Sequence, residues 1–239
     1  MKYSRYGASG ILIEWPAKID ENILSDILNY KKSLQNKYVK EKLYIINTYN
    51  SLLINYNFTI DNINDKILTL KGLYSNLNRE VNLNNQLWKI PVCYDDDFAI
   101  DIDHFSQEKK VSKSDIIKWH SAPLYTVFFI GFLPGFLYLG GLDKRLHFSR
   151  RKTPNPSIKK GAVAIGGEQT GIYPQQSPGG WHIIGNSPIE FFDPKKEVPC
   201  FAQAGDKIQC VPISLDEYHS ISKKVKTGNY QLKPEVYHG

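Results

Sequence analysis

The sequence predicts an α+β protein of two domains, a ferredoxin-like βαββαβ unit over residues 1–88 followed by a β-barrel over residues 89–239. The N-terminal part alternates short apolar runs with segments whose apolar residues recur every three or four positions, as in amphipathic helices. Beyond Pro123 the character changes to brief aromatic or β-branched runs separated by glycine and proline. A chain of 239 residues is long enough to form two modest cores.

The N-terminal domain is predicted to contain strands and helices in alternation. Strands are expected at residues 11–15, 43–46, 51–54 and 87–92. The middle two are separated by polar turn residues and indicate a hairpin. Helical spacing covers residues 19–34, with Asp20 as a possible N-cap. A second helical pattern covers residues 60–77 and ends before an asparagine-rich stretch at 82–85. The resulting order is a common scaffold that by itself says nothing about activity.

The second domain is predicted to open with two short helices. The first covers residues 99–105 behind an N-cap at Asp97, and the second begins at the capping-box spacing of Ser112 and Asp115. Brief strands are expected at residues 125–132, 161–165, 181–184, 189–192 and 207–211. Many short strands of this kind favour a barrel, because closure removes the unpaired edges through which sheets aggregate.

Charge and composition narrow the classes of partner. Hydrophobic residues make up 41% and aromatic residues 13% of the chain, as in ordinary globular proteins. The net charge of +6 is scattered except in one loop-like stretch. Its basic residues are Arg145, Arg150, Arg151, Lys152, Lys159 and Lys160. A solvated loop is favoured there over a contact for an anionic substrate or partner. No RNP, zinc-finger or helix-turn-helix pattern accompanies the charge, so nucleic acid is not an expected partner.

Residues 1–10 contain no apolar core of the signal-peptide type, and no run of about 18 apolar residues occurs, so a cytoplasmic protein without membrane contact is expected. The three cysteines are odd in number and lack CxxC spacing, which favours buried thiols over disulfides or zinc. The histidines form no HxxxH or HExxH pair. The acidic run 95–97 is more typical of a solvated loop or helix N-terminus than of a cation site, so no metal site is expected.

Three glycine-rich segments are the candidates for chemistry. The first, residues 131–141, holds four glycines with Phe132, Phe136 and Tyr138, and predicts either a binding wall or an aromatic barrel corner. The second, residues 164–174, superficially resembles a phosphate cradle. It lacks both GxxxxGK[ST] and GxGxxG spacing, so a hairpin turn is favoured over a nucleotide site of standard type.

The third glycine-rich segment, residues 175–182, places Ser177 close to His182 in the chain. A nucleophilic serine needs a base within about 3 Å of its hydroxyl and a third group that orients the base. No GxSxG elbow surrounds Ser177, so a hydroxyl that stabilises a turn is the favoured interpretation and a catalytic serine the alternative.

These segments, in this order, carry a resemblance to a known family. The matching positions are residues 90–94, His120, Tyr125, and residues 131–136, 138–142, 169–174, 177–181, 184–185 and 192–194. They resemble the family of KipI and the 5-oxoprolinase B subunit, also called allophanate hydrolase subunit 1. The resemblance extends over the whole chain, but before Pro91 it depends on the predicted element order and on residues 49–53.

The resemblance implies a small N-terminal α/β domain and a C-terminal cyclophilin-like β-barrel. It also implies pairing with a homologous barrel protein, the C subunit, of the allophanate hydrolase subunit 2 or KipA type. With an A subunit of the lactam-utilisation type, the complex opens 5-oxoproline to L-glutamate using ATP with Mg, and the isolated chain is expected to be inactive. Alternatives within the family are an inhibitor of a sporulation-type histidine kinase and a component of a biotin-dependent urea carboxylase.

The resemblance implies site residues only as hypotheses. Catalytic candidates are His120, Tyr125, Thr170, Tyr173 and Ser177. Candidates for substrate or partner binding are Phe132, Pro134, Gly135, Phe136, Tyr138, Gly171, Pro178, Gly179, Gly180 and Trp181. The family often has Arg where this chain has Asn155, so an anion contact from that loop would have to come from Arg150, Arg151 or Lys152. An inhibitor would instead need exposed apolar residues, for which Phe132, Pro134, Phe136 and Tyr138 are candidates.

Overall fold

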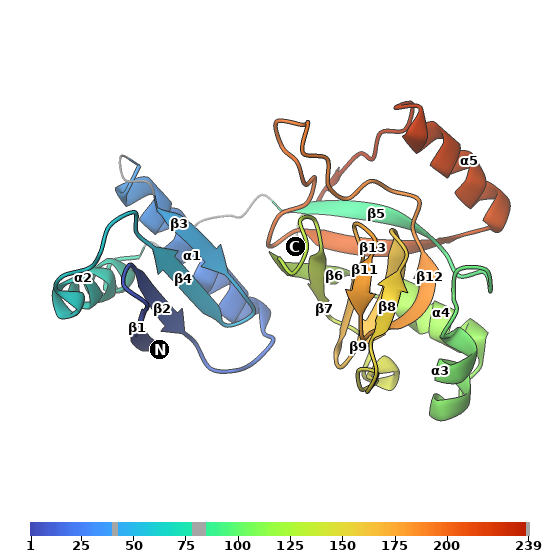
Figure 1. The fold of residues 1–239 in the computed structure, drawn as a ribbon, viewed down its shortest axis with the longest axis horizontal. Coiled ribbons are helices and arrows are strands. Elements are labelled where there is room, and N and C mark those ends of the chain that lie inside the picture. Colours follow the sequence, from blue (N-terminus) through green and yellow to red (C-terminus); the bar gives the residue numbers. More distant parts are fainter. Residues whose placement is uncertain (40–42, 78–84, 238–239) are drawn as a thin grey trace. The chain divides into compact units, whose positions relative to one another are not determined.

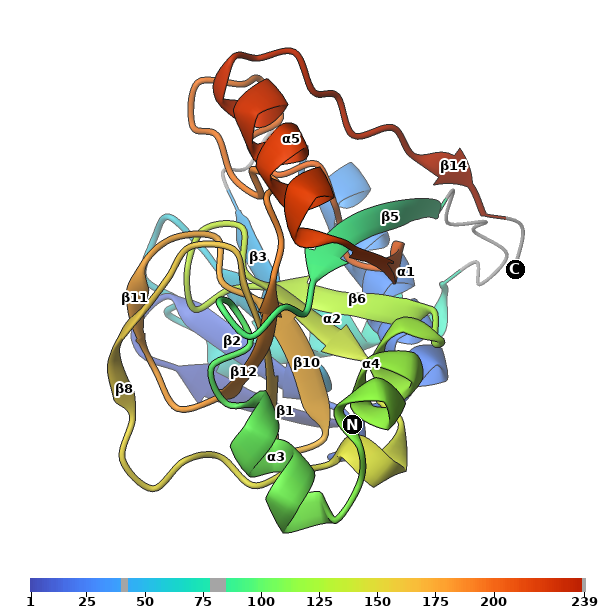
Figure 2. The same ribbon diagram turned by 90° about the vertical axis from the view of Figure 1, so that its right-hand side faces the viewer.

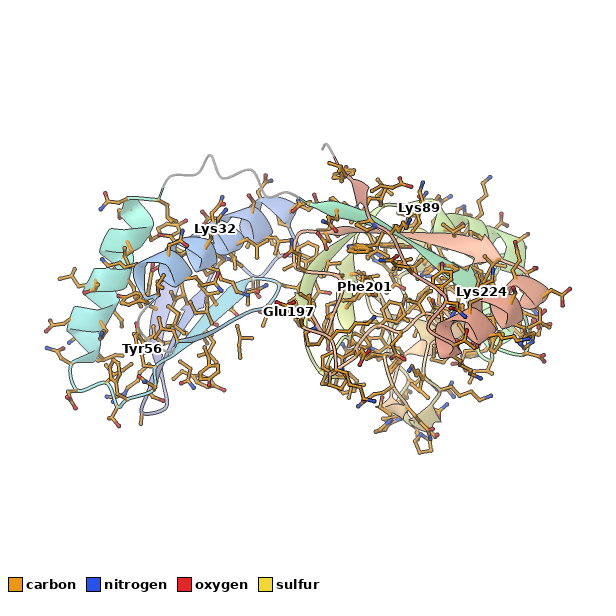
Figure 3. All side chains as sticks on the ribbon, turned by 90° about the horizontal axis from the view of Figure 1, so that it is seen from above. Lys32, Tyr56, Lys89, Glu197, Phe201 and Lys224 are labelled. Carbon is orange, nitrogen blue, oxygen red and sulfur yellow. The ribbon has the colours of Figure 1, made fainter. Side chains whose placement is uncertain are left out.

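The computed structural model describes residues 1–39, 43–77 and 85–237. The chain divides into two compact units, Met1–Leu83 and Asn84–Gly239 (Figure 1). Each unit has its own apolar core, with Tyr56 in the first and Trp88 packed on Phe201 in the second (Figure 3). The asparagine-rich positions 82–84 lie outside the described residues. No helix in the described part of the chain combines the length and the apolar character needed to cross a bilayer.

The N-terminal unit is an antiparallel sheet covered on one face by two helices (Figure 1). In sheet order its strands are β1 (Lys2–Tyr6), β2 (Gly10–Glu14), β4 (Ser51–Asn55) and β3 (Tyr44–Asn47), and its helices are α1 (Glu21–Lys37) and α2 (Ile63–Ser75). Alternate strand residues such as Ile11 and Ile54 are fully buried in one core with Tyr30 of α1. Asp20 caps α1, as predicted, by accepting hydrogen bonds from two free backbone N–H groups of the first turn.

The order of these elements differs from the predicted βαββαβ unit. The described residues give ββαββα, so the ferredoxin-like arrangement expected for residues 1–88 is not found. Strand β1 was missed because its sequence, KYSRY, has no apolar alternation to distinguish an edge strand from a polar terminus. Residues 87–92, expected as the last strand of this domain, belong instead to β5 (Gln86–Cys93), which pairs in parallel with a strand some 120 residues later. The second unit therefore begins before β5.

The second unit is built on a closed barrel of seven strands within the described residues. Around the barrel they are β12 (His182–Asn186), β9 (Ala162–Gly166), β10 (Gln169–Ile172), β7 (Leu137–Gly140), β6 (Tyr125–Ile130), β13 (Lys207–Ile213) and β5. Pairing of Asn186 with Cys93 closes the ring between β12 and β5 (Figure 2). The predicted barrel is confirmed in this form, and β14 (Glu235–Val236) pairs with the first two residues of β5.

Short elements complete the barrel unit. They are α3 (Ile102–Lys109), α4 (Lys113–Ser121), η1 (Lys144–Leu146), β8 (Asn155–Ile158), β11 (Ser177–Gly179) and α5 (Leu215–Lys226). Ser112 caps α4 as predicted, whereas α3 begins after Asp101 rather than after Asp97. The strand predicted at residues 189–192 is wrong: Ile189 and Phe191 are buried in the barrel core but belong to a loop.

The barrel wall separates two apolar clusters. On β9, Val163 and Ile165 face the interior and belong to the barrel core, to which all seven strands contribute. The alternate residues Ala162 and Ala164 belong to a second cluster, here called the outer cluster. Its members are Phe136, Ile158, Ala162, Ala164, Tyr173, Trp181 and Ile183. Because side chains alternate along a strand, this cluster lies on the outside of the barrel, beside the two-stranded ribbon of β8 and β11.

Candidate functional site

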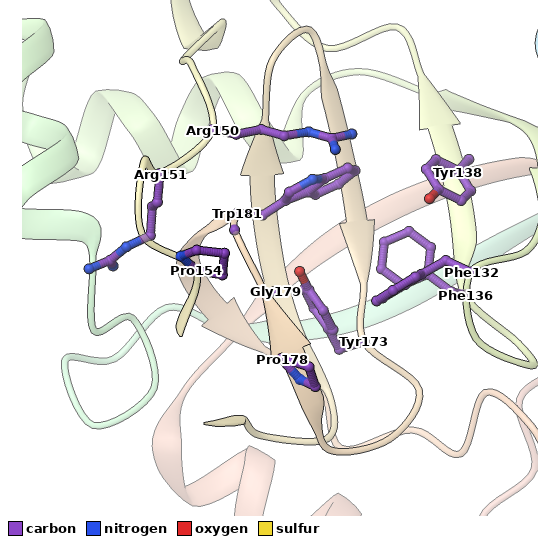
Figure 4. Close-up of a pocket in the computed structure, with 11 residues that line it drawn as sticks. Phe132, Phe136, Tyr138, Arg150, Arg151, Pro154, Tyr173, Pro178, Gly179 and Trp181 are labelled. Atoms are coloured by element: carbon purple, nitrogen blue, oxygen red, sulfur yellow. The ribbon is translucent and has the colours of Figure 1, made fainter. Parts of the chain in front are cut away.

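A pocket of about 380 Å³ opens beside the outer cluster, and we call it the aromatic pocket (Figure 4). It is lined by Phe132, Phe136, Tyr138, Arg150, Arg151, Pro154, Tyr173, Pro178, Gly179, Gly180 and Trp181. These residues come from the β6–β7 loop and β7, from the loop before β8, and from the segment between β10 and β12. The fold thus brings residues of all three glycine-rich segments of the sequence to one place.

The pocket wall is a set of aromatic rings arranged around Phe136. The Phe136 ring centroid lies 4.9 Å from that of Tyr138, 5.3 Å from Tyr173 and 5.6 Å from Trp181. The last two pairs are edge-to-face, the geometry that aromatic quadrupoles favour. These rings therefore hold one another in place as a layer beneath the pocket, in which Phe136, Tyr173 and Trp181 are buried and Tyr138 is half-buried.

Glycines are needed where these rings approach the backbone. A Cβ at Gly166 would lie 2.5 Å from Cδ1 of Trp181, and a Cβ at Gly179 would lie 2.3 Å from the hydroxyl oxygen of Tyr173. Neither distance is compatible with van der Waals contact. Close packing of the rings, rather than a phosphate cradle, accounts for glycine at these two positions.

Phe132 stands at the pocket in an unusual backbone conformation. Its φ is 65°, in the left-handed region that costs a residue with a Cβ about 1 kcal/mol or more. The side chain is 61% exposed, with its ring edge-to-face against Phe136 at 5.7 Å. Hydrogen bonds from Leu133 N to Gly131 O and from Phe136 N to Leu133 O hold the turn. A large apolar ring is thus kept in contact with solvent by a strained turn.

The two arginines of the pocket are in different electrostatic states. Arg151 forms an ion pair with Asp101, whose other carboxylate oxygen accepts a 2.8 Å hydrogen bond from Ile183 N. The guanidinium of Arg150 lies 5.5 Å from the centroid of the Trp181 ring, and none of the described residues forms an ion pair with it. Arg150 is therefore the cation of the pocket whose charge the described residues do not neutralise.

Two tyrosines share the field of Arg150. Burial raises the pKa of Tyr173 to about 12, and the Arg150 guanidinium opposes part of that rise. Burial also raises the pKa of Tyr138, again against the effect of Arg150. Both phenols are protonated at neutral pH, so each carries an O–H that can donate a hydrogen bond.

Three catalytic candidates lie elsewhere, in a buried group of Tyr94, His120, Tyr125 and Thr170 that we call the His120 cluster. His120 is completely buried, with Nδ1 2.7 Å from the Tyr94 hydroxyl and Nε2 2.8 Å from the Thr170 hydroxyl. Thr170 donates its proton to Ala164 O, so it accepts from Nε2–H, and Nδ1 accepts from Tyr94. Tyr125 donates to the His120 carbonyl oxygen at 2.6 Å. Burial lowers the pKa of His120 to about 3, so the imidazole is neutral.

The remaining candidates are divided between the pocket and its surroundings. Tyr173 lines the pocket, whereas Ser177 contacts the Pro178 carbonyl oxygen at 3.2 Å. His182 is bound through Nε2 to Ser149 O at 3.0 Å, and the described residues show no hydrogen bond between His182 and Ser177. Serine and histidine are thus close in the chain but turned to different partners.

Seven of the ten binding candidates line the pocket, namely Phe132, Phe136, Tyr138, Pro178, Gly179, Gly180 and Trp181. Pro134 is exposed on the β6–β7 loop, Gly135 lies against Phe191 and Phe192, and Gly171 lies under the Phe136 ring. Pro154 was missed, because nothing in its local sequence distinguishes it from an ordinary loop proline.

The chain is similar in sequence to a known domain family and to several named proteins. A family described as the carboxyltransferase domain, subdomain C and D, matches residues 1–202, which include every residue of the aromatic pocket. The chain is 39% identical over 142 residues to the B subunit of 5-oxoprolinase from Bacillus subtilis, covering 59% of each protein. It is 44% identical over 123 residues to the protein of that name from Haemophilus influenzae, covering 52% of this chain and 58% of the relative. The chain thus spans under two thirds of these relatives' length.

More distant similarity is found to larger proteins. Urea amidolyase of Saccharomyces cerevisiae is 27% identical over 147 residues, which cover 56% of this chain and 8% of that protein. The crystal structure of the protein TTHA0988 superposes with a TM-score of 0.74 at 28% identity, covering 86% of this chain and 40% of that one. Kluyveromyces lactis urea amidolyase superposes over 98% of this chain and 16% of its own, with a TM-score of 0.82 at 18% identity, and that likeness shows the fold alone.

Proposed function

The chain belongs to the carboxyltransferase domain family, subdomain C and D, and we propose that within it the chain acts as the B subunit of an ATP-dependent 5-oxoprolinase. The observation that carries this proposal is the identity of 39% and 44% to two proteins named as that subunit, against 27% to a urea amidolyase. In the proposed reaction, this chain and its A and C partners together open 5-oxo-L-proline to L-glutamate in the cytoplasm.

The reaction sets a specific physical problem. A lactam carbonyl is a poor electrophile, and transfer of a phosphoryl group from ATP to the amide oxygen would make the carbon susceptible to water. Water then attacks that carbon, the C–N bond breaks, and the ring nitrogen takes up a proton. A second water releases inorganic phosphate from the resulting acyl phosphate, so the products are glutamate, ADP and phosphate. Donors and cations placed around the amide would stabilise the charge that develops. The aromatic pocket, with one cation and two phenols, is the part of this chain proposed to contribute.

ATP with Mg does not fit the residues of this chain. The described residues contain no group of three His, Cys, Asp or Glu side chains placed to hold a metal ion. The pocket offers a single guanidinium without an acidic partner, whereas a triphosphate carries several negative charges. We therefore assign nucleotide binding, and with it the phosphoryl transfer, to the partner proteins in this proposal.

The urea carboxylase alternative is supported by the similarity to urea amidolyases and predicts turnover of urea rather than of a lactam. The kinase-inhibitor alternative needs an exposed apolar surface. Of its four candidate residues only Phe132 and Pro134 are exposed, while Phe136 is buried and Tyr138 is half-buried. That leaves little apolar surface at this position for a kinase to bind.

The test is to co-express the chain with candidate A and C partners and to measure glutamate formed from 5-oxoproline. We expect formation that requires ATP and all three proteins, with no turnover by the isolated chain. A complex lacking this chain is the matched control, and urea with bicarbonate is the competing substrate. A folded, complete complex that forms no glutamate would remove the enzyme proposal. Autophosphorylation of a histidine kinase in the presence of the isolated chain tests the inhibitor alternative.

A further inference from the structure

We propose that the aromatic pocket binds a small cyclic carboxylic acid, with the ring against the aromatic wall and the carboxylate paired with Arg150. The choice of 5-oxoproline as the particular acid rests on the proposed function, whereas the class of ligand follows from the pocket itself. Three properties of the pocket define that class: its size and apolar wall, its single uncompensated cation, and its hydroxyl groups.

The volume of the pocket and its aromatic lining favour a ligand with a small ring. The volume of about 380 Å³ lies near the lower end of the range for small-molecule sites, roughly 300–1,000 Å³. The rings of Phe136, Tyr173 and Trp181 fix one another as a floor that is at most 5% exposed, and the exposed Phe132 and half-buried Tyr138 offer ring surface to a ligand. A long chain or an extended peptide would gain little from a wall this compact.

The positive charge of Arg150 favours a ligand with one carboxylate. The planar guanidinium of Arg150 lies over the Trp181 indole at the edge of the pocket (Figure 4), an arrangement that limits its freedom while leaving its N–H groups available. A guanidinium fork matches a carboxylate with two parallel hydrogen bonds. Arg151 cannot serve in the same way, because Asp101 already neutralises it. One uncompensated positive charge therefore matches a ligand with one negative charge.

The two phenols favour a lactam as the ring of the ligand, and Arg150 disfavours a ligand with an ammonium group. Tyr138 and Tyr173 line the same pocket as Trp181, and a protonated phenol can donate a hydrogen bond to a lactam carbonyl (Figure 4). An amino acid such as L-proline has the same ring size but carries an ammonium group, which Arg150 would repel. The pocket should therefore prefer a neutral lactam acid over a zwitterion.

Direct binding is the test, with the indole N–H resonance of Trp181 as the probe. The chain has four tryptophans, and Trp181→Phe identifies the resonance of interest. Titration with 5-oxoproline should shift it, and 2-pyrrolidinone, which lacks the carboxylate, and L-proline should bind about tenfold more weakly or worse. Arg150→Gln should weaken 5-oxoproline binding by a similar factor. Lys152→Gln, a neutralised cation of the same loop outside the pocket lining, is the matched control and should bind as the wild type does.

The outcomes separate this inference from the proposed function. A chain that binds 5-oxoproline through Arg150, in a complete complex that forms no glutamate, leaves the inference standing and removes the proposed function. An active complex in which Arg150→Gln leaves the KM for 5-oxoproline unchanged retains the proposed function and overturns the inference. The inference is also overturned if Arg150→Gln and wild type bind alike, or if Trp181 responds to the ligand neither in the isolated chain nor in the complex.

Discussion

The aromatic pocket and the His120 cluster occupy opposite sides of one barrel wall, and their polar groups are in opposite states. In the cluster, both imidazole nitrogens of His120 have partners and the ring has no exposed surface. In the pocket, Arg150 forms no ion pair with the described residues and lies at the surface. Strand alternation produces the separation: Thr170 points to the cluster, and the next residue, Gly171, lies under the Phe136 ring of the pocket.

This difference shows how to choose among polar residues of similar motifs. A side chain whose hydrogen-bonding capacity is used inside the protein stabilises the fold, and a side chain that is reachable and not neutralised can act on a ligand. By that criterion His120, Tyr125 and Thr170 are assigned to stability, and Arg150 to binding. Substitutions on either side of the wall can break this division or sharpen it.

The largest effect is expected from His120→Ala. It removes a fully buried ring and the hydrogen bonds that the ring makes with the Tyr94 and Thr170 hydroxyls, which together should cost about 3–5 kcal/mol of unfolding free energy. Urea denaturation measures the loss, and His219→Ala, at an exposed position on α5, should change stability by less than about 0.5 kcal/mol. A His120→Ala protein of unchanged stability that abolished glutamate formation in the complex would instead make His120 catalytic.

The second effect is a loss of stability in acid. The folded-state pKa of His120 is about 3, whereas the unfolded value is near 6.5, so between these values the unfolded state binds more protons. The contribution of neutral His120 to the unfolding free energy is complete above pH 6.5. It is lost as pH falls toward 3, at up to about 1.4 kcal/mol per pH unit. Burial lowers the pKa of His182 as well, which adds in the same direction. Urea midpoints between pH 7.5 and 4.5 should fall less steeply in His120→Asn, and equal slopes would contradict the assignment.

The same wall explains which parts of the fold the sequence could predict. Barrel strands with apolar runs, such as β9 and β13, were found by their pattern. Strands β7 and β10 were not, because their glycines resemble turns, although Gly171 is a strand residue that makes room for Phe136. The loop at residues 189–192 gave the reverse error: it is apolar because it is buried, and burial alone does not make a strand.

For the site, the local sequence could indicate candidate motifs but not the distant residues that these motifs contact. The three glycine-rich segments meet only because the barrel register and the β8–β11 pairing bring them together. Adjacent Arg150 and Arg151 are equivalent in the sequence, and Asp101, fifty residues earlier in the chain, is what neutralises one and not the other. Contacts over such separations are not encoded in any local pattern.

A smaller effect, on the pocket side, is expected from Gly166→Ala. The added methyl would lie 2.5–2.6 Å from atoms of the Trp181 indole, so the ring must move, at a cost of about 1–3 kcal/mol. The change should also alter Trp181 fluorescence and weaken ligand binding. Gly72→Ala is the matched control: it lies in α2 with no atom within 4 Å of the new Cβ, and should stabilise by about 0.5–1 kcal/mol. Effects of the same sign would mean that Trp181 is not packed against Gly166.

The smallest effect, and the sharpest test of the division, is expected at Phe132. Phe132→Ala and Phe132→Gly both remove a ring that is 61% exposed, but only glycine adopts a φ of 65° without strain. The glycine variant should therefore be more stable than the alanine variant by about 1 kcal/mol in urea denaturation. Both should bind 5-oxoproline equally weakly, because both lack the ring at the pocket. Equal stabilities would show that the turn is not strained, and wild-type affinity in either variant would exclude Phe132 from the binding surface. A strained aromatic residue that lowers stability and raises affinity is what separates a binding wall from a barrel corner.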